Sequence, residues 1–207
     1  CPAATRSPAS LARAAPRRLI DKSPSYALDP RLLARAEQLF PQARYIHLVR
    51  HPIPTCRSFV QRRMGKLLGH DGLDSPRAAA QVWTIGNQNL LDFLADLAPD
   101  RVLQIHYEAL VRDPPPVLAR ICEFLGLTYD PAMADPHARR FPGEERGVVG
   151  DPGFYARKGV DPELADRWQT DPATDDLSPE TAAVAARLGY DLGDAPNLAA
   201  LHLDPTI

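Results

Sequence analysis

The sequence predicts an α/β fold in which a parallel sheet is flanked by helices. Three short runs of mainly apolar and β-branched residues have the length of buried strands, at 18–21, 45–49 and 101–107. The segments between and after these runs place apolar residues at the three- and four-residue spacing of helices. Strands that are separated by helices pair in parallel, because each helix returns the chain across the sheet.

The elements expected up to residue 68 are a strand at 18–21, a helix at 30–40, a strand at 45–49 and a helix at 55–68. Asp29 is a suitable N-cap for the first of these helices, and Pro30 fits its first turn. Pro52 and Pro54 cannot continue a hydrogen-bonded ladder, so we expect the second strand to end before them. The second helix is predicted by the spacing of Phe59, Val60, Met64, Leu67 and Leu68.

The elements expected after residue 68 are a loop at 69–75, a long helix from Ser75-Pro76, a strand at 101–107, a helix at 116–125 and a last helix at 179–188. The long helix has a continuous apolar stripe, made of Ala79, Val82, Trp83, Gly86, Leu90, Phe93, Leu94 and Leu97. Gly126 suits the left-handed conformation that commonly ends a helix.

The chain is expected to form a single domain over residues 1–207, a length that permits a sizeable core. Residues 129–170 are rich in proline, glycine and charge. We expect them to form a loop-rich segment that covers a cofactor or substrate, with a short helix at 163–168. The tail at 191–207 is expected to be loosely ordered.

The composition excludes several classes of protein. A net charge of −2 does not indicate a general nucleic-acid binder. The three cysteines lack paired spacing, which argues against a disulfide framework and a zinc site, so we expect no metal. The apolar runs are too short for a membrane span or a signal peptide, and we therefore expect a cytoplasmic protein without membrane partners.

One strand is predicted to deliver an arginine to an anion site. Arg50 follows the run at 45–49, and Ser58 lies eight residues later on the next expected helix. The guanidinium supplies a fork of donors and the serine a hydroxyl donor. Open α/β sheets bind ligands at the carboxyl ends of their strands. The alternative, an arginine that caps a strand and a surface serine, is common for any such pair.

Arg50 and Ser58 are accompanied along the chain by other motifs, which follow one another in a fixed order. The segments are RLIDKSPSY at 18–26, YIHLVRHP at 45–52, VLQIHYEALVRDP at 102–114 and EFLGL at 123–127. Together they resemble the sulfotransferase family that uses 3′-phosphoadenosine-5′-phosphosulfate (PAPS). In that family an LVRxP strand and the serine after it hold the 3′-phosphate, and YExL and FLGL motifs complete the pattern.

Within this family, the chain most resembles the sulfotransferase domains of olefin-forming polyketide synthases of the curacin type. Matching motifs lie in the same order at 21–30, 45–52, 81–89 and 151–168. Four motifs in order are far more specific than any one alone. The resemblance implies a P-loop-NTPase-like sulfotransferase fold. It also implies a hydroxyl acceptor on a small molecule or on a polyketide-like chain bound to an acyl carrier protein.

The resemblance assigns roles to four residues. Arg50 and Ser58 would bind the 3′-phosphate of PAPS. Lys22 stands at the family's lysine, which stabilises charge on the leaving phosphate; the alternative is a solvated lysine in a turn. Tyr107 would approach the adenosine, although a buried tyrosine at a strand end is an equally good interpretation.

No general base is assigned. Pro24 occupies the position where the cytosolic branch of the family has its histidine. His47 and His106 lie in expected strands and are interpreted as core or near-core residues, and His51 as a local hydrogen-bonding residue. Chance better explains the Arg157-Lys158-Gly159 match to a cofactor-closing motif, and packing better explains Trp168.

The chain departs from the family at its beginning. The family's PKSGTT-like loop, whose amides hold the 5′-phosphosulfate at a helix N-terminus, has no counterpart here, and residues 1–15 contain no glycine. We therefore expect an N-terminally truncated domain or the C-terminal part of a longer protein, without measurable sulfuryl transfer of its own.

Two alternatives to an enzyme that transfers sulfuryl groups remain. The first is a non-catalytic remnant or interaction module that binds adenosine 3′,5′-bisphosphate. The second is a phosphoryl-transfer enzyme with a similar sheet, which is disfavoured because the sequence has neither a Walker lysine loop nor an evident acidic metal pair.

Overall fold

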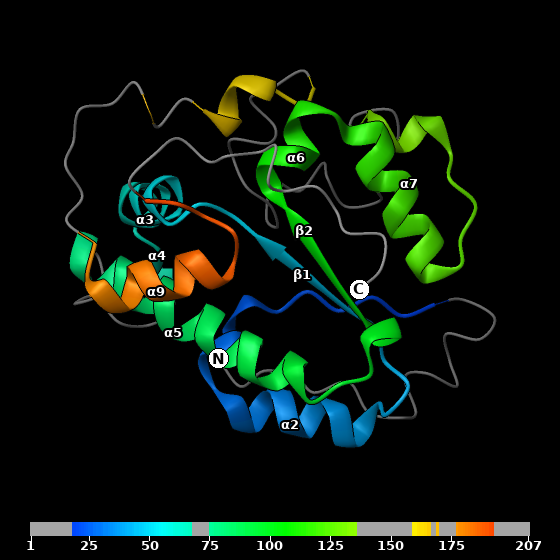
Figure 1. Cartoon of the computed structure of the whole chain (residues 1–207), viewed down its shortest axis with the longest axis horizontal. Helices are drawn as coiled ribbons and strands as arrows, with labels where there is room; N and C mark the ends of the chain where they lie inside the picture. Colours follow the sequence, from blue (N-terminus) through cyan, green and yellow to red (C-terminus); the bar gives the residue numbers. More distant parts are fainter. Residues whose placement is uncertain (1–17, 68–74, 136–158, 167–168, 170–176, 193–207) are drawn as a thin grey trace. The chain divides into compact units, whose positions relative to one another are not determined.

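The fold is that of a computed structural model, which describes residues 18–67, 75–135, 159–166, 169 and 177–192 (Figure 1). The chain divides into two compact units. The first unit comprises Cys1–His47, His51–Val102 and Ala173–Ile207, and the second unit comprises Leu48–Arg50 and Leu103–Pro172. The single-domain organisation over 1–207 stays a prediction.

The described part of the chain contains two strands, β1 and β2, among helices and short 3₁₀ turns. They are η1 (Pro24–Leu28), α2 (Pro30–Leu39), β1 (Tyr45–Val49), α3 (Pro52–Gln61), α4 (Met64–Leu67), α5 (Pro76–Ala95), η3 (Pro99–Arg101), β2 (Val102–His106), α6 (Tyr107–Arg112), α7 (Pro114–Leu125), η4 (Pro131–Ala134), η6 (Pro162–Ala165) and α9 (Pro179–Arg187). The η elements are 3₁₀ turns.

β1 and β2 pair as neighbours and run in the same direction (Figure 1). In β1 the burial alternates, with His47 and Val49 buried and Ile46 and Leu48 exposed. This period of two is the expected consequence of side chains that point to opposite faces of a strand. The parallel sheet and the bounds of its first strand are therefore as the sequence predicted.

The strand predicted at 18–21 is wrong. Residues 18–23 have no regular secondary structure, and η1 begins at Pro24. The carboxylate of Asp21 accepts hydrogen bonds from the hydroxyls of Ser23 at 3.1 Å and Tyr26 at 3.0 Å. These local bonds and the following proline favour a turn over an extended ladder.

The single helix predicted at 55–68 is divided, and it begins earlier. α3 starts at Pro52, because proline fits the first helical turn and Nδ1 of His51 accepts a hydrogen bond from the Ile53 amide at 3.3 Å. Arg63, with a φ of 50°, separates α3 from α4. Such a left-handed residue interrupts the right-handed helical path.

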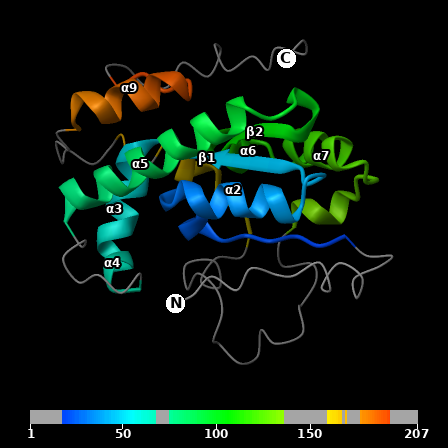
Figure 2. The same cartoon turned by 90° about the horizontal axis from the view of Figure 1, so that it is seen from below.

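α5 forms the centre of the first unit. Ser75 caps it by accepting a hydrogen bond from the Ala78 amide at 3.2 Å, as the Ser75-Pro76 pair predicted. α2, α3, α9 and η1 all contact α5, and Figure 2 shows α5 between α2 and α9. A Cβ atom at Gly86 would lie in van der Waals contact with the side chains of Ala27 and Leu28, 3.6 Å from each, so α5 packs closely against η1 at this position.

The asparagines of α5 bind groups on neighbouring elements. Asn87 donates to the Trp83 carbonyl at 2.8 Å, while its Oδ1 lies 3.0 Å from Nε2 of His47 on β1. Asn89 donates to the Ala27 carbonyl of η1 at 2.9 Å. Asn87 and Asn89 therefore connect α5 to two other parts of the first unit.

A chain of hydroxyls connects α9 to α5. Thr84 donates to the Ala80 carbonyl at 2.8 Å, so its oxygen must accept from Thr181, 2.8 Å away. The hydroxyls of Thr181 and Ser178 lie 3.2 Å apart. Ser178 also caps α9 by accepting from the Thr181 amide.

The second unit continues from β2 directly into α6 and then α7 (Figure 1). β2 ends at His106, so Tyr107 is the first residue of a helix and not the last residue of a strand, and α6 was not predicted. α7 begins at Pro114 instead of residue 116 and ends at Gly126, whose φ of 62° confirms the predicted left-handed end.

The later segments agree only in part with prediction. The short helix expected at 163–168 is the 3₁₀ turn η6, and Asp166, just after it, forms an ion pair with Arg112 of α6. The last helix, α9, has the predicted start. Residues 68–74, 136–158, 167–168 and 193–207, with Arg157, Lys158, Trp168 and most of the tail, lie outside the described residues.

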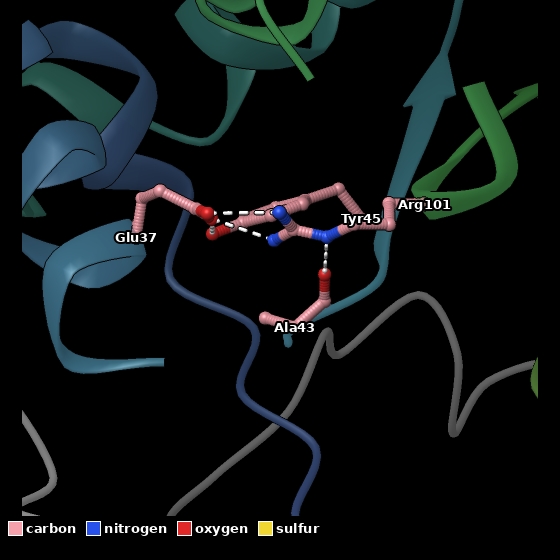
Figure 3. Close-up of polar contacts among 4 residues, drawn as sticks. All are labelled: Glu37, Ala43, Tyr45 and Arg101. Carbon is pink, nitrogen blue, oxygen red and sulfur yellow. Dashed lines mark hydrogen bonds and ion pairs between the residues drawn. The ribbon is translucent and has the colours of Figure 1, made fainter. Parts of the chain in front are cut away.

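A cluster of three polar side chains holds the beginnings of both strands (Figure 3). Arg101 donates from Nη1 and Nη2 to the two carboxylate oxygens of Glu37, at 2.9 and 2.7 Å, and from Nε to the Ala43 carbonyl at 2.9 Å. Tyr45 donates to Glu37 at 2.8 Å, and its ring meets the edge of Phe93 on α5. We call Glu37, Tyr45 and Arg101 the strand-start cluster.

The strand-start cluster perturbs the acid–base properties of its members. Hydrogen bonds from Arg101 are the main reason that the pKa of Glu37 lies below its usual value. Burial, followed by the hydrogen bond to Glu37, raises the pKa of the Tyr45 phenol. A lowered carboxyl pKa contributes stability above the unfolded-state pKa of about 4.3, and this contribution is lost as the pH falls through the folded-state pKa.

We predict that Glu37→Gln lowers the free energy of unfolding at pH 7 by about 1–2 kcal/mol, because an uncharged amide with a single acceptor oxygen replaces the carboxylate that accepts two bonds from Arg101. The deficit should shrink as the pH falls below the unfolded-state pKa of about 4.3, and it should be lost once the pH passes below the lowered folded-state pKa. Urea unfolding between pH 3 and 7 measures both effects. Asp96→Asn, the same loss of charge at an exposed residue after α5, is the control. A deficit that is equally large at pH 3 would contradict the prediction.

Candidate functional site

Arg50 lies where β1 ends and α3 is about to begin. It follows Val49, the last residue of the strand, and precedes His51, whose side chain is fully buried and caps α3. The Arg50 side chain is partly buried. Because the strand and the capped helix fix the backbone on both sides, the position of this arginine is set by local structure.

Tyr107 lies at the corresponding end of the neighbouring strand. β2 ends at His106, and Tyr107 opens α6. The guanidinium carbon of Arg50 lies over the Tyr107 ring, 4.4 Å from its centroid, and both residues belong to the second unit. Two neighbouring strands thus bring a cation and an aromatic ring into contact at their carboxyl ends.

Lys22 and Ser58 both belong to the first unit. Lys22 is exposed between Asp21 and Ser23, the two residues whose side chains form the local turn. Ser58 is partly buried on α3, nearly two turns from its start. The structure therefore brings together Arg50 and Tyr107 among the predicted site residues, and the roles of all four stay predictions.

Two of the histidines hold structural contacts in the first unit. His47 is buried, and its Nε2 must carry a proton, because its partner, Oδ1 of Asn87, can only accept. His51 accepts through Nδ1 from the Ile53 amide, so the neutral ring has its proton on Nε2. The ring of Tyr190, from the segment after α9, packs edge-on against His51 at 5.3 Å. The interpretations of His47 as a core residue and of His51 as a local hydrogen-bonding residue are confirmed.

Sequence reasoning missed two buried residues near these elements. Glu108, 1% exposed, follows Tyr107 in the first turn of α6, where the helix dipole favours an acid. Tyr190, 2% exposed, supports His51. The YExL motif pointed to Glu108 without giving it a role, whereas no local pattern pointed to Tyr190.

The described residues contain neither a metal cluster nor a membrane span. Among them, no group of three or more His, Cys, Asp or Glu side chains gathers closely enough to hold an ion. No helix in the described part of the chain is both long and apolar enough to cross a bilayer. A guanidinium held against an aromatic ring at the carboxyl end of a parallel sheet suits an anionic ligand.

Two solved structures superpose on this chain. The chain superposes on a sulfotransferase domain from the curacin biosynthetic pathway with a TM-score of 0.77 and 42% identity, over 86% of this chain and 64% of that one. It superposes on a sulfotransferase domain from the Synechococcus PCC 7002 olefin synthase with a TM-score of 0.78 and 42% identity, over 89% of this chain and 63% of that one. The chain therefore spans a little under two thirds of each solved domain.

Sequence comparison with curated proteins finds more distant relatives. The chain is 28% identical over 131 residues to protein-tyrosine sulfotransferase of Drosophila melanogaster, which is 63% of this chain and 25% of the relative. It is 30% identical over 94 residues to protein-tyrosine sulfotransferase A of Caenorhabditis elegans, which is 45% of this chain and 24% of the relative. The matched region is thus about a quarter of the length of each curated relative.

Residues 5–131 match the sequence pattern of the sulfotransferase family, and this match covers more than half of the chain. The structural likeness at 42% identity agrees with it. The chain belongs to the sulfotransferase family and has its α/β fold.

Proposed function

We propose that this chain is part of a sulfotransferase, an enzyme that moves a sulfuryl group from PAPS to a hydroxyl of a small-molecule or carrier-bound acceptor. The observation that carries the proposal is the contact between Arg50 and Tyr107, where β1 and β2 end. Ligands of open α/β sheets bind at this edge, and an arginine placed there suits a phosphate.

Arg50 and Ser58 are proposed to bind the 3′-phosphate of the nucleotide. The guanidinium of Arg50 offers planar donors that match two phosphate oxygens at once. Ser58 stands on α3, the helix that begins two residues after Arg50, so both residues are attached to one short stretch of backbone. This attachment supports a shared role in binding the 3′-phosphate, because a movement at the start of α3 would displace both Arg50 and Ser58.

Lys22 is proposed to act on the reaction itself. During transfer, the acceptor oxygen forms a bond to sulfur while the bond between sulfur and the bridging phosphate oxygen breaks. The phosphate leaves with added negative charge, and the acceptor proton passes to a base. A lysine ammonium near that oxygen stabilises the charge as it develops. The turn formed by Asp21 and Ser23 leaves Lys22 exposed and able to reach a ligand.

The acceptor is proposed to be a polyketide-like hydroxyl. The two solved relatives at 42% identity are named for the curacin pathway and for an olefin synthase, and the protein-tyrosine sulfotransferases are 28–30% identical over shorter matches. Higher identity over more of the chain supports a shared acceptor class, so a chain bound to an acyl carrier protein is preferred over a protein tyrosine.

We predict that the chain binds adenosine 3′,5′-bisphosphate more tightly than AMP. A charged hydrogen bond to the 3′-phosphate is worth about 1.5–3 kcal/mol, which corresponds to roughly 10- to 100-fold in Kd. Titration calorimetry of both nucleotides measures this preference, and Arg50→Ala should remove most of it. Arg35→Ala, at an exposed position on α2, is the matched control and should leave it unchanged. Equal affinities of the wild-type chain for both nucleotides would contradict the assignment.

We predict that Lys22→Ala lowers kcat of the full-length protein far more than it weakens nucleotide binding. Lys22 would stabilise charge that appears in the transition state, so removing its side chain should lower kcat. Arg50→Ala should instead raise the KM for PAPS first. Steady-state kinetics with radiolabelled PAPS compares the two variants. The same kinetic signature for both would show that the division of roles is wrong, and binding without any transfer by the wild type would favour a non-catalytic remnant.

We predict a higher kcat/KM for a β-hydroxyacyl chain on an acyl carrier protein than for a tyrosine-containing peptide, since specificity is the ratio of these constants for competing acceptors. Both acceptors are assayed with labelled PAPS and the full-length protein. The matched control is the same carrier protein with an acyl chain that lacks the hydroxyl, which should accept no label. Preference for the tyrosine peptide would overturn the acceptor assignment and leave the donor assignment intact.

A further inference from the structure

The contact between Arg50 and Tyr107 restricts what each residue can do. The guanidinium carbon lies 4.4 Å from the ring centroid, so one face of the Tyr107 ring is covered by the cation. That face cannot stack on a nucleotide base. The donors of a guanidinium point outward from its carbon, so a guanidinium whose carbon lies over a ring can still bind an oxyanion through N–H groups that point away from the ring.

The Tyr107 ring projects from a helix, α6, that is anchored within the second unit. Tyr107 is the first residue of α6. Two other residues of this helix are buried: Glu108 is 1% exposed and Val111 is 5% exposed. Arg112 at the end of the same helix forms an ion pair with Asp166 after η6. α6 is therefore anchored along its length within the second unit, and its first side chain projects from a fixed point.

We propose that Tyr107 is a positioning residue: it holds the Arg50 guanidinium in place, and so sets the preference for a 3′-phosphorylated nucleotide. The proposal rests on the proposed function, because it needs Arg50 to be the phosphate ligand. It changes the role expected for Tyr107 from a direct contact with adenosine to an effect that passes through Arg50. A flexible arginine would lose rotamer entropy on binding phosphate, and the ring removes part of that cost beforehand.

Titration calorimetry of the 207-residue chain with adenosine 3′,5′-bisphosphate and with AMP tests this role. Tyr107→Leu should weaken binding of the bisphosphate by about 3- to 30-fold, the range of a cation–π contact, and leave AMP binding nearly unchanged. Tyr107→Phe keeps the ring and should keep the preference. In an Arg50→Ala background, Tyr107→Leu should have little further effect. Tyr129→Leu, a partly buried tyrosine after α7, is the matched control.

Each outcome separates this inference from the proposed function. If the wild-type chain does not prefer the bisphosphate, the proposed function fails and the positioning role fails with it. If the preference exists but Tyr107→Leu weakens both nucleotides equally, the ring contacts the adenosine, and only the positioning role is wrong. A Tyr107→Phe variant that behaves like Tyr107→Leu would assign the effect to the hydroxyl and also overturn it.

A measurement without ligand gives an independent check. Urea unfolding of the wild type, Tyr107→Leu, Arg50→Ala and the double variant forms a double-mutant cycle. We expect the two substitutions to be non-additive, because the second has no contact left to remove. Strictly additive losses would show that the two side chains do not support each other, and the positioning role would then be rejected.

Discussion

The bidentate ion pair between Arg101 and Glu37 fixes the place at which both strands begin. Arg101 directly precedes β2, Glu37 lies on α2, and Tyr45, the first residue of β1, donates to the same carboxylate. One carboxylate thus receives donors from the starts of two adjacent strands. A shift of either strand by one residue would exchange its two faces and remove a donor, so the cluster opposes such a shift.

The strand ends bring two residues together within the second unit. Both strands are five residues long, and the chain leaves them at Arg50 and Tyr107, whose side chains are in contact. The two strand ends lead into their helices in different ways. His51 caps α3 directly after Arg50, whereas Tyr107 itself begins α6. The proposed phosphate site therefore consists of a strand-to-helix junction from each strand, and its chemistry follows from that geometry.

Much of the secondary structure could be predicted, and the errors share a physical cause. Helix starts at Asp29 and Ser75 and the helix end at Gly126 were predicted, because capping side chains and a left-handed glycine act over a few residues. The strand expected at 18–21 is absent, and Arg63 divides an expected helix. In both cases apolar spacing suggested a regular element, while local hydrogen bonds or backbone geometry favoured a break.

The sequence by itself determined the fold class, the family resemblance and the positions of Arg50, Ser58, Tyr107 and Lys22 along the chain, because motifs and periodicity are local properties. Only the tertiary structure placed the Arg50 guanidinium over the Tyr107 ring, bound Arg101 to Glu37 across 64 residues, and packed Tyr190 against His51. Contacts between residues so distant in sequence depend on how the elements pack. No spacing rule along the chain encodes that packing.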